Sequence, residues 1–194
     1  AAETLVALAR AHAGRLTLIA LGPMTNLALA LRLDAEALGS VGRVVWMGGA
    51  VDVRGNVTPD AEFNAYVDPD AAREVFEAGL SVDVVPLDAT RQTRIEGDQL
   101  HAALAGRPGP LAARIEAFTE QIFRRWGYMN LHDPLAVGLA VDESLARWEP
   151  ARIAVGDGGQ TRRADGAPNC RVAKVVDVER FLALFFDRLC PAAS

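Results

Sequence analysis

The sequence predicts an α/β protein with an open, mostly parallel sheet flanked by helices. Three short apolar runs, 16–21, 44–47 and 82–86, are separated by segments that favour helix. Strands that alternate with helices of about ten residues form βαβ units, whose right-handed crossovers make the strands parallel. The runs lack polar alternation, which is typical of strands that are buried on both faces of a sheet.

The predicted helices follow from their spacing and their ends. Residues 1–10 resemble the middle of an amphipathic helix, and 24–33 places Leu27 and Leu31 on one packing side. Asp68-Pro69 supplies an N-cap and a proline in the first turn of a helix that ends before Gly79. We therefore expect each of the first two strands to be followed by a helix that packs on the sheet.

The second half of the chain continues the same single domain, which we expect to span residues 1–194. An apolar stripe at spacings of four and three predicts a long helix over 111–126, with the stripe packed in the core. Asp133-Pro134 opens a further helix, with Asp133 as its N-cap. The remaining expected elements are short strands at 153–155 and 172–176, a surface hairpin or loop over 156–169, and a terminal helix over 178–189.

Composition narrows the classes of function. The chain has 194 residues, with 20 Lys and Arg against 25 Asp and Glu, for a net charge of -5. It therefore lacks the broad positive field that binding to nucleic acid or an anionic membrane requires. No apolar run reaches the length of a membrane span. Cys170 and Cys190 have neither metal-binding nor redox spacing, which favours a reduced, cytoplasmic protein.

The candidate site lies at the carboxyl ends of the strands, where ligands bind in open α/β sheets. The three strands lead into 21–26, 47–50 and 87–90. The Gly48-Gly49 pair would let a ligand approach the backbone closely, although an ordinary tight turn explains it equally well. The polar loop 53–64 is long for a connection between strand and helix, and its amide and carboxylate groups suit a polyhydroxylated ligand.

His132 and Asp133 form another candidate pair. Asp133 alone is explained by helix capping, and a lone histidine beside a cap is commonly a packed or surface residue. Together they could place a carboxylate toward a cation or a sugar and an imidazole toward a leaving group.

Four motifs, in order, resemble the nucleoside hydrolases of the inosine-uridine preferring type. They are Leu-Gly-Pro-Met-Thr-Asn-Leu-Ala at 21–28, Met-Gly-Gly-Ala at 47–50, Ala-Glu-Phe-Asn at 61–64 followed by Asp68-Pro69, and His-Asp-Pro-Leu at 132–135. The resemblance covers most of the chain. It implies a calcium-dependent N-ribohydrolase that cleaves the N-glycosidic bond of a small-molecule ribonucleoside to give ribose and a free base.

The same resemblance implies roles for individual residues. Asn56, Glu62 and Asn64 would hydrogen-bond the ribose hydroxyls. Met47 would lie against the sugar ring, and His132 would assist departure of the base. The carboxylate of Asp133 and the main-chain carbonyl of Leu21 would bind Ca²⁺. Members of the family commonly form homo-oligomers.

The sequence also departs from the family pattern. The family's opening strand and its aspartate-rich turn have no counterpart here, so we expect residues 1–194 to correspond to the last two thirds of the domain. Calcium needs about six to eight oxygen ligands, so we expect an incomplete metal site and impaired hydrolysis. The alternatives are an inactive fragment and a non-catalytic module that binds ribose or a nucleoside. Residues 91–104, Trp126 and Tyr128 either line a base pocket or serve in packing.

Overall fold

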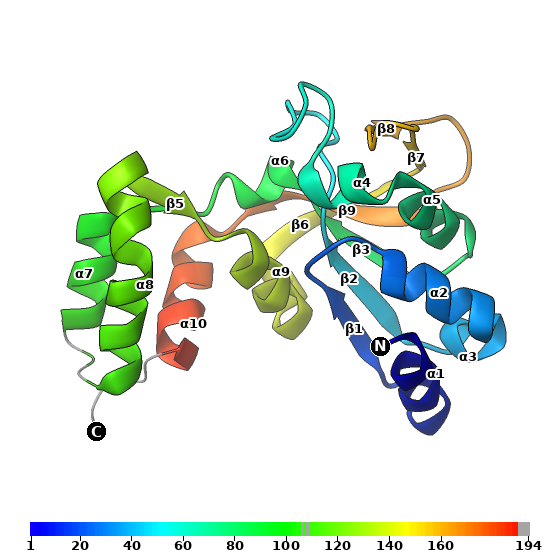
Figure 1. Cartoon of the computed structure of the whole chain (residues 1–194), viewed down its shortest axis with the longest axis horizontal. Coiled ribbons are helices and arrows are strands. Elements are labelled where there is room, and N and C mark those ends of the chain that lie inside the picture. Colours follow the sequence, from blue (N-terminus) through cyan, green and yellow to red (C-terminus); the bar gives the residue numbers. More distant parts are fainter. Residues whose placement is uncertain (106, 108, 190–194) are drawn as a thin grey trace.

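The computed structural model describes residues 1–105, 107 and 109–189, and it shows a central sheet with helices on both faces (Figure 1). Cys190 lies outside the described residues. The helices are α1 (Ala2–Ala11), α2 (Thr25–Leu33), α3 (Ala35–Gly39), α4 (Phe63–Val67), α5 (Pro69–Glu77), α6 (Leu87–Thr90), α7 (Gly97–Ala105), α8 (Pro110–Trp126), α9 (His132–Val141) and α10 (Val178–Leu189), with a 3₁₀ turn at Glu143–Leu145. The strands are β1 (Thr17–Ala20), β2 (Arg43–Met47), β3 (Val82–Val85), β4 (Arg94–Glu96), β5 (Tyr128–Asn130), β6 (Ala146–Ala151), β7 (Ile153–Val155), β8 (Thr161–Arg163) and β9 (Cys170–Val176).

The main sheet has the strand order β1-β2-β3-β9-β6. The first four strands are parallel, and β6 runs antiparallel to β9. The α/β prediction and its first three parallel strands are therefore confirmed. The antiparallel edge strand β6 was not predicted, because it alternates exposed and partly buried positions and includes Pro150. The expected hairpin over 156–169 is present in part, since β7 pairs antiparallel with β8.

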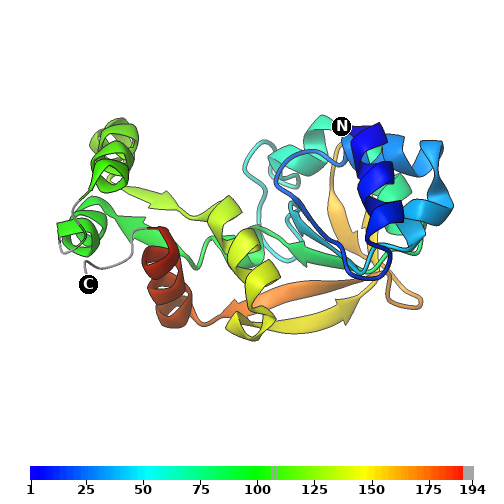
Figure 2. The same ribbon diagram turned by 90° about the horizontal axis from the view of Figure 1, so that it is seen from below.

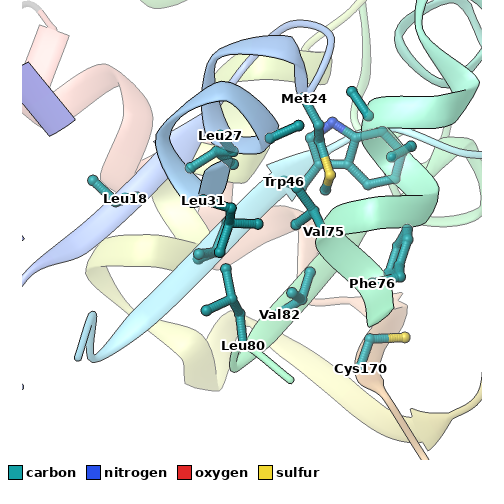
Figure 3. Close-up of a cluster of buried hydrophobic side chains, with 14 of the residues drawn as sticks. Leu18, Met24, Leu27, Leu31, Trp46, Val75, Phe76, Leu80, Val82 and Cys170 are labelled. Atoms are coloured by element: carbon teal, nitrogen blue, oxygen red, sulfur yellow. The ribbon is translucent and has the colours of Figure 1, made fainter. Parts of the chain in front are cut away.

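The strands divide the core into two apolar clusters, one on each face of the sheet. Val44 and Trp46 point into the cluster under α1, α2, α3 and α5, whereas Val45 and Met47 point to the opposite cluster, which α9 and α10 cover. Figure 3 shows the first cluster, where the rings of Trp46 and Phe76 meet edge to face with centroids 5.7 Å apart. This alternation fixes which side chains of β2 can approach α9.

The prediction that the first strand is buried on both faces is wrong. β1 is an edge strand, and the side chain of Ile19 is 40% exposed. An apolar run shows that a strand is hydrophobic, whereas the burial of that strand depends on neighbours that are distant in sequence. The start of α5 is as expected. Asp68 is its N-cap, and Oδ1 of Asp68 accepts a 3.0 Å hydrogen bond from the nitrogen of Ala71.

The prediction that the stripe of α8 packs in the core is also wrong for most of its residues. Phe118 is 78% exposed and Trp126 is 61% exposed. Of the stripe, Ile115 packs in the core. It lies with Ala112 and Phe123 in the cluster that also includes residues of α7. In Figure 2 the α7–α8 pair lies at the end of the molecule remote from α1. Within the described residues, no helix combines the length and apolarity that crossing a membrane demands.

Candidate functional site

The candidate site lies at the carboxyl edge of the parallel strands, as the sequence predicts. Leu21 directly follows β1 and Met47 is the last residue of β2. Helix α6 begins two residues after β3. Because β1, β2 and β3 are parallel and in register, these three chain segments leave the sheet at the same edge.

The Gly48-Gly49 turn after β2 is held by hydrogen bonds from its own backbone. The nitrogen of Gly49 donates to Oε2 of Glu62 at 2.9 Å, and the nitrogen of Ala50 donates to Oγ1 of Thr161 at 2.8 Å. Gly49 has φ +85°, and a Cβ there would lie 2.9 Å from the Thr161 hydroxyl. Glycine is thus required here by the tight turn and by the close approach of Thr161.

Glu62 is a buried carboxylate, 2% exposed, at the N-cap of α4. Besides Gly49, its oxygens accept hydrogen bonds from the backbone nitrogens of Asn64 and Ala65. Burial raises the pKa of Glu62, and the negative charge of Asp133 raises it further, while the backbone donors lower it. The charge of Asp133 thus acts on Glu62 although the two residues lie far apart in sequence.

The two asparagines of the polar loop have different surroundings. Asn64 is buried, and its Nδ2 donates a 2.9 Å hydrogen bond to the carbonyl of Met47. Asn56 is exposed, and its Oδ1 accepts a 3.0 Å hydrogen bond from the nitrogen of Phe63. Asn64 therefore joins α4 to the end of β2, and Asn56 holds the loop against the start of α4.

His132 and Asp133 are the first two residues of α9, so the prediction that Asp133 is the N-cap is wrong. The N-cap is Leu131, which makes no side-chain capping bond, and the helix begins two residues earlier than the Asp-Pro pair suggests. Nδ1 of His132 lies 2.6 Å from Oγ1 of Thr90. Burial lowers the pKa of His132 and raises the pKa of Asp133. Among the described residues, the side chain of Asp133 has no hydrogen-bond or ion-pair partner.

Comparison with known proteins decides the family. The model of the family described as inosine-uridine preferring nucleoside hydrolase matches residues 1–183. The chain belongs to this family. The resemblance read from the four sequence motifs is therefore confirmed.

Several nucleoside hydrolases resemble this chain along nearly its whole length. It is 32% identical to the pyrimidine-specific ribonucleoside hydrolase RihA of Shigella boydii, over 97% of this chain and 66% of RihA. It is 34% identical to the probable uridine nucleosidase 2 of Arabidopsis thaliana, over 96% of this chain and 65% of that protein. The chain thus spans slightly less than two thirds of the length of these relatives.

Solved structures confirm the fold. A plant nucleoside hydrolase matches with a TM-score of 0.90 and 31% identity, over 97% of this chain and 66% of that one. A purine-preferring ribonucleoside hydrolase from Gardnerella vaginalis matches with a TM-score of 0.86 and 33% identity, over 97% of this chain and 65% of that one. The expectation of a nucleoside hydrolase fold is correct.

The described residues do not by themselves fit the calcium ion that the resemblance to nucleoside hydrolases implies. Leu21 and Asp133 line the same pocket of about 470 Å³, and the rest of its lining is mainly apolar. Across the part of the chain that the structure describes, no three His, Cys, Asp or Glu residues gather where they could hold a metal ion. One carboxylate and one carbonyl fall short of the six to eight oxygen ligands, roughly, that calcium takes.

The structure brings most of the predicted site residues of this nucleoside hydrolase family member to one edge and adds others. Thr90 and Thr161 were not singled out in the sequence. Thr90 lies in the segment 87–90 that follows the third strand, so its place was predictable, but its contact with the helix at 132 was not. Thr161 lies in a segment expected only as a surface hairpin. The suggested base-pocket residues Trp126 and Tyr128 lie outside this cluster of contacts, and Tyr128 stacks under the guanidinium of Arg94 at 3.8 Å.

Proposed function

We propose that this chain supplies the ribose-binding and leaving-group side of a ribonucleoside hydrolase site. The reaction breaks the N-glycosidic bond of a small-molecule ribonucleoside with water, giving ribose and a free base. One observation carries the proposal: the buried Glu62 and Asn64 meet the end of β2, where the nitrogen of Gly49 donates to Oε2 of Glu62 at 2.9 Å and Nδ2 of Asn64 donates to the carbonyl of Met47 at 2.9 Å. Membership of the nucleoside hydrolase family supports the same reaction.

The existing hydrogen bonds indicate which atoms would contact ribose. A carboxylate has about four acceptor positions. Oε2 of Glu62 accepts from three backbone nitrogens, whereas Oε1 accepts from Asn64 alone. Oε1 therefore retains capacity for a sugar hydroxyl. A hydroxyl bound to a charged acceptor contributes about 1.5 to 3 kcal/mol.

The asparagines offer complementary groups. Nδ2 of Asn64 is engaged with Met47, which leaves its Oδ1 to accept from a hydroxyl. Oδ1 of Asn56 is engaged with Phe63, which leaves its Nδ2 to donate. We propose that this donor and these acceptors bind ribose hydroxyls, with Met47 against the sugar ring and His132 toward the departing base.

The cellular setting is part of the proposal. Two cysteines without metal-binding or redox spacing support a cytoplasmic location. The exposed apolar side chains of α8, among them Phe118 and Trp126, support a homo-oligomer. Asp133 and the carbonyl of Leu21 are proposed as two of the oxygen ligands of Ca²⁺, and the described residues do not supply the others.

The test separates hydrolysis from binding. Release of ribose from inosine, uridine and a nitrophenyl riboside is measured in calcium-containing buffer, and binding of the same nucleosides is measured by calorimetry. We expect Asn64→Ala to weaken binding at least tenfold, because a buried polar contact to the sugar is lost. Glu77→Ala, exposed at the end of α5, is the control and should leave both binding and release unchanged.

The alternatives give different results. Nucleoside binding without ribose release would identify a non-catalytic binding module. Absence of both binding and release at millimolar nucleoside, in a chain shown to be folded, would contradict the proposed site.

A further inference from the structure

We propose that Thr90 is a positioning residue, which holds the neutral imidazole of His132 in the tautomer that carries its proton on Nε2. The significance of this tautomer for catalysis rests on the proposed function. The tautomer itself follows from contacts within the chain and is tested independently of activity.

The hydroxyl of Thr90 is placed to donate to His132. Thr90 is the last residue of α6, is fully buried, and has Oγ1 at 2.6 Å from Nδ1 of His132. Among the residues that the structure describes, the Thr90 hydroxyl has no other hydrogen-bond partner. Its proton can therefore be accepted by Nδ1 or left without an acceptor.

The two possible arrangements differ in what they leave unsatisfied. If Nδ1 carried the proton and donated to Oγ1, the hydroxyl proton of Thr90 would have no acceptor in a buried place. If the hydroxyl donates to a bare Nδ1, both groups are satisfied. Burying an unsatisfied donor is unfavourable, so the second arrangement is preferred. The imidazole proton then lies on Nε2.

A second threonine fixes the same turn against the start of α9. The hydroxyl of Thr93 donates a 2.9 Å hydrogen bond to the carbonyl of Thr90. The nitrogen of Leu131 donates a 3.1 Å hydrogen bond to the carbonyl of Thr93. The turn after β3 therefore holds both the backbone before His132 and the ring of His132, so the imidazole has a defined position as well as a defined tautomer.

The preferred tautomer leaves a hydrogen-bond donor for the substrate. Within the described part of the chain, Nε2 of His132 has no partner. A protonated Nε2 can donate to a nitrogen or oxygen of the leaving base, whereas a bare Nε2 could only accept. Thr90 would thus determine that His132 meets the base as a donor.

The imidazole nitrogen signals test the tautomer directly. The protein contains three histidines, so His132 is assigned in a ¹⁵N-labelled sample by comparison with His132→Gln. A bare imidazole nitrogen resonates far downfield of one that carries a proton. At a pH where the ring is neutral, we expect Nδ1 to give the downfield signal and Nε2 the upfield one. The reverse assignment would overturn the proposal, and this result needs no variant of Thr90.

Three variants test whether Thr90 is the cause. Thr90→Val keeps the side-chain shape and removes the hydroxyl, so the two nitrogen signals should move toward each other as the tautomers mix. Thr90→Ser keeps the hydroxyl and should retain the wild-type shifts. Thr119→Val is the control, because it removes a hydroxyl that donates to the carbonyl of Ile115 within α8, away from the turn that holds His132. Unchanged His132 shifts in a folded Thr90→Val protein would overturn the role of Thr90.

Kinetics provide a separate measurement. Where ribose release is observed, Thr90→Val should lower kcat by about tenfold with little change in KM, and Thr90→Ser should restore it. Absence of turnover in the wild-type chain would count against the proposed function, whereas the nitrogen shifts would still decide the role of Thr90.

Discussion

The hydroxyl of Thr161 makes two hydrogen bonds to one residue, accepting from the nitrogen of Ala50 at 2.8 Å and donating to its carbonyl at 3.1 Å. Thr161 belongs to β8, in a hairpin at the surface, whereas Ala50 belongs to the turn at the end of β2. The hairpin therefore supports the turn whose Gly49 contacts Glu62.

Thr161→Val is expected to destabilise the fold by about 2 kcal/mol. The valine keeps the shape but leaves the polar backbone groups of Ala50 without partners, at about 1 to 3 kcal/mol each when fully buried. Chemical denaturation measures the free energy of unfolding. Thr161→Ser keeps the hydroxyl, so its free energy of unfolding should fall by less than half as much as that of the valine variant. Equal stability of the valine variant and the wild type would show that the contact is not needed.

Glu62→Ala is expected to destabilise the fold by about 3 kcal/mol. Three backbone nitrogens, those of Gly49, Asn64 and Ala65, would lose their acceptor in a buried place. Urea denaturation tests this, with the exposed Glu77→Gln as the control. A loss no larger than that of the control would contradict the structural role of Glu62.

We also expect the contribution of Glu62 to the free energy of unfolding to depend on pH. Burial raises the pKa of Glu62 above its ordinary value of 4.5. Between 4.5 and the raised pKa, the unfolded chain has released a proton that the folded chain retains. The contribution of Glu62 to stability is thus full below pH 4.5 and is lost as the pH rises through the folded pKa. The difference in unfolding free energy between wild type and Glu62→Gln isolates this effect from other carboxylates. A difference that grows with rising pH would contradict it.

Phe118→Ser is expected to change the free energy of unfolding of the monomer by less than about 0.5 kcal/mol, because the phenyl ring is mostly exposed. Phe181→Ala is the comparison, because Phe181 of α10 is buried against α9 and the loss of its ring should cost about 3 to 5 kcal/mol. Both values come from denaturation at low protein concentration. Similar losses in the two variants would show that α8 is covered in solution.

Cys170 is expected to resist thiol reagents while the protein is folded. It is buried, and burial raises the pKa of its thiol to about 12, so the reactive thiolate is scarce at neutral pH. A Cys190→Ser variant leaves Cys170 as the remaining thiol, and its rate of alkylation is followed with and without urea. Fast labelling of the folded variant would contradict the burial of Cys170.

The sequence predicted the elements whose signals are local. The strands at 44–47 and 82–86 and the cap at Asp68 were found because short apolar runs and an Asp-Pro pair act within a few residues. The apolar periodicity of α8 identified the helix but not its packing, because periodicity identifies an apolar face and not what covers that face. The Asp-Pro signal failed at Asp133 because α9 begins at His132, after an N-cap residue, Leu131, that makes no side-chain capping bond.

The residues of the candidate site were predictable, but their partners were not. The motifs containing Glu62 and His132 could be recognised in the sequence. That Glu62 would bind the nitrogen of Gly49, and His132 the hydroxyl of Thr90, depends on how the strands leave the sheet. These contacts join segments from separate strands, so they follow from the topology.

The place of Thr161 in the chain affects when the site can form during translation. Every residue proposed to contact ribose or the base, from Met47 to His132, is synthesised before Thr161. The strand β9, which pairs with β3 inside the sheet, is synthesised later still. A nascent chain that has emerged only as far as α9 therefore contains these groups without the hairpin that supports the turn at Ala50, so the arrangement is completed only after β8 and β9 have been synthesised.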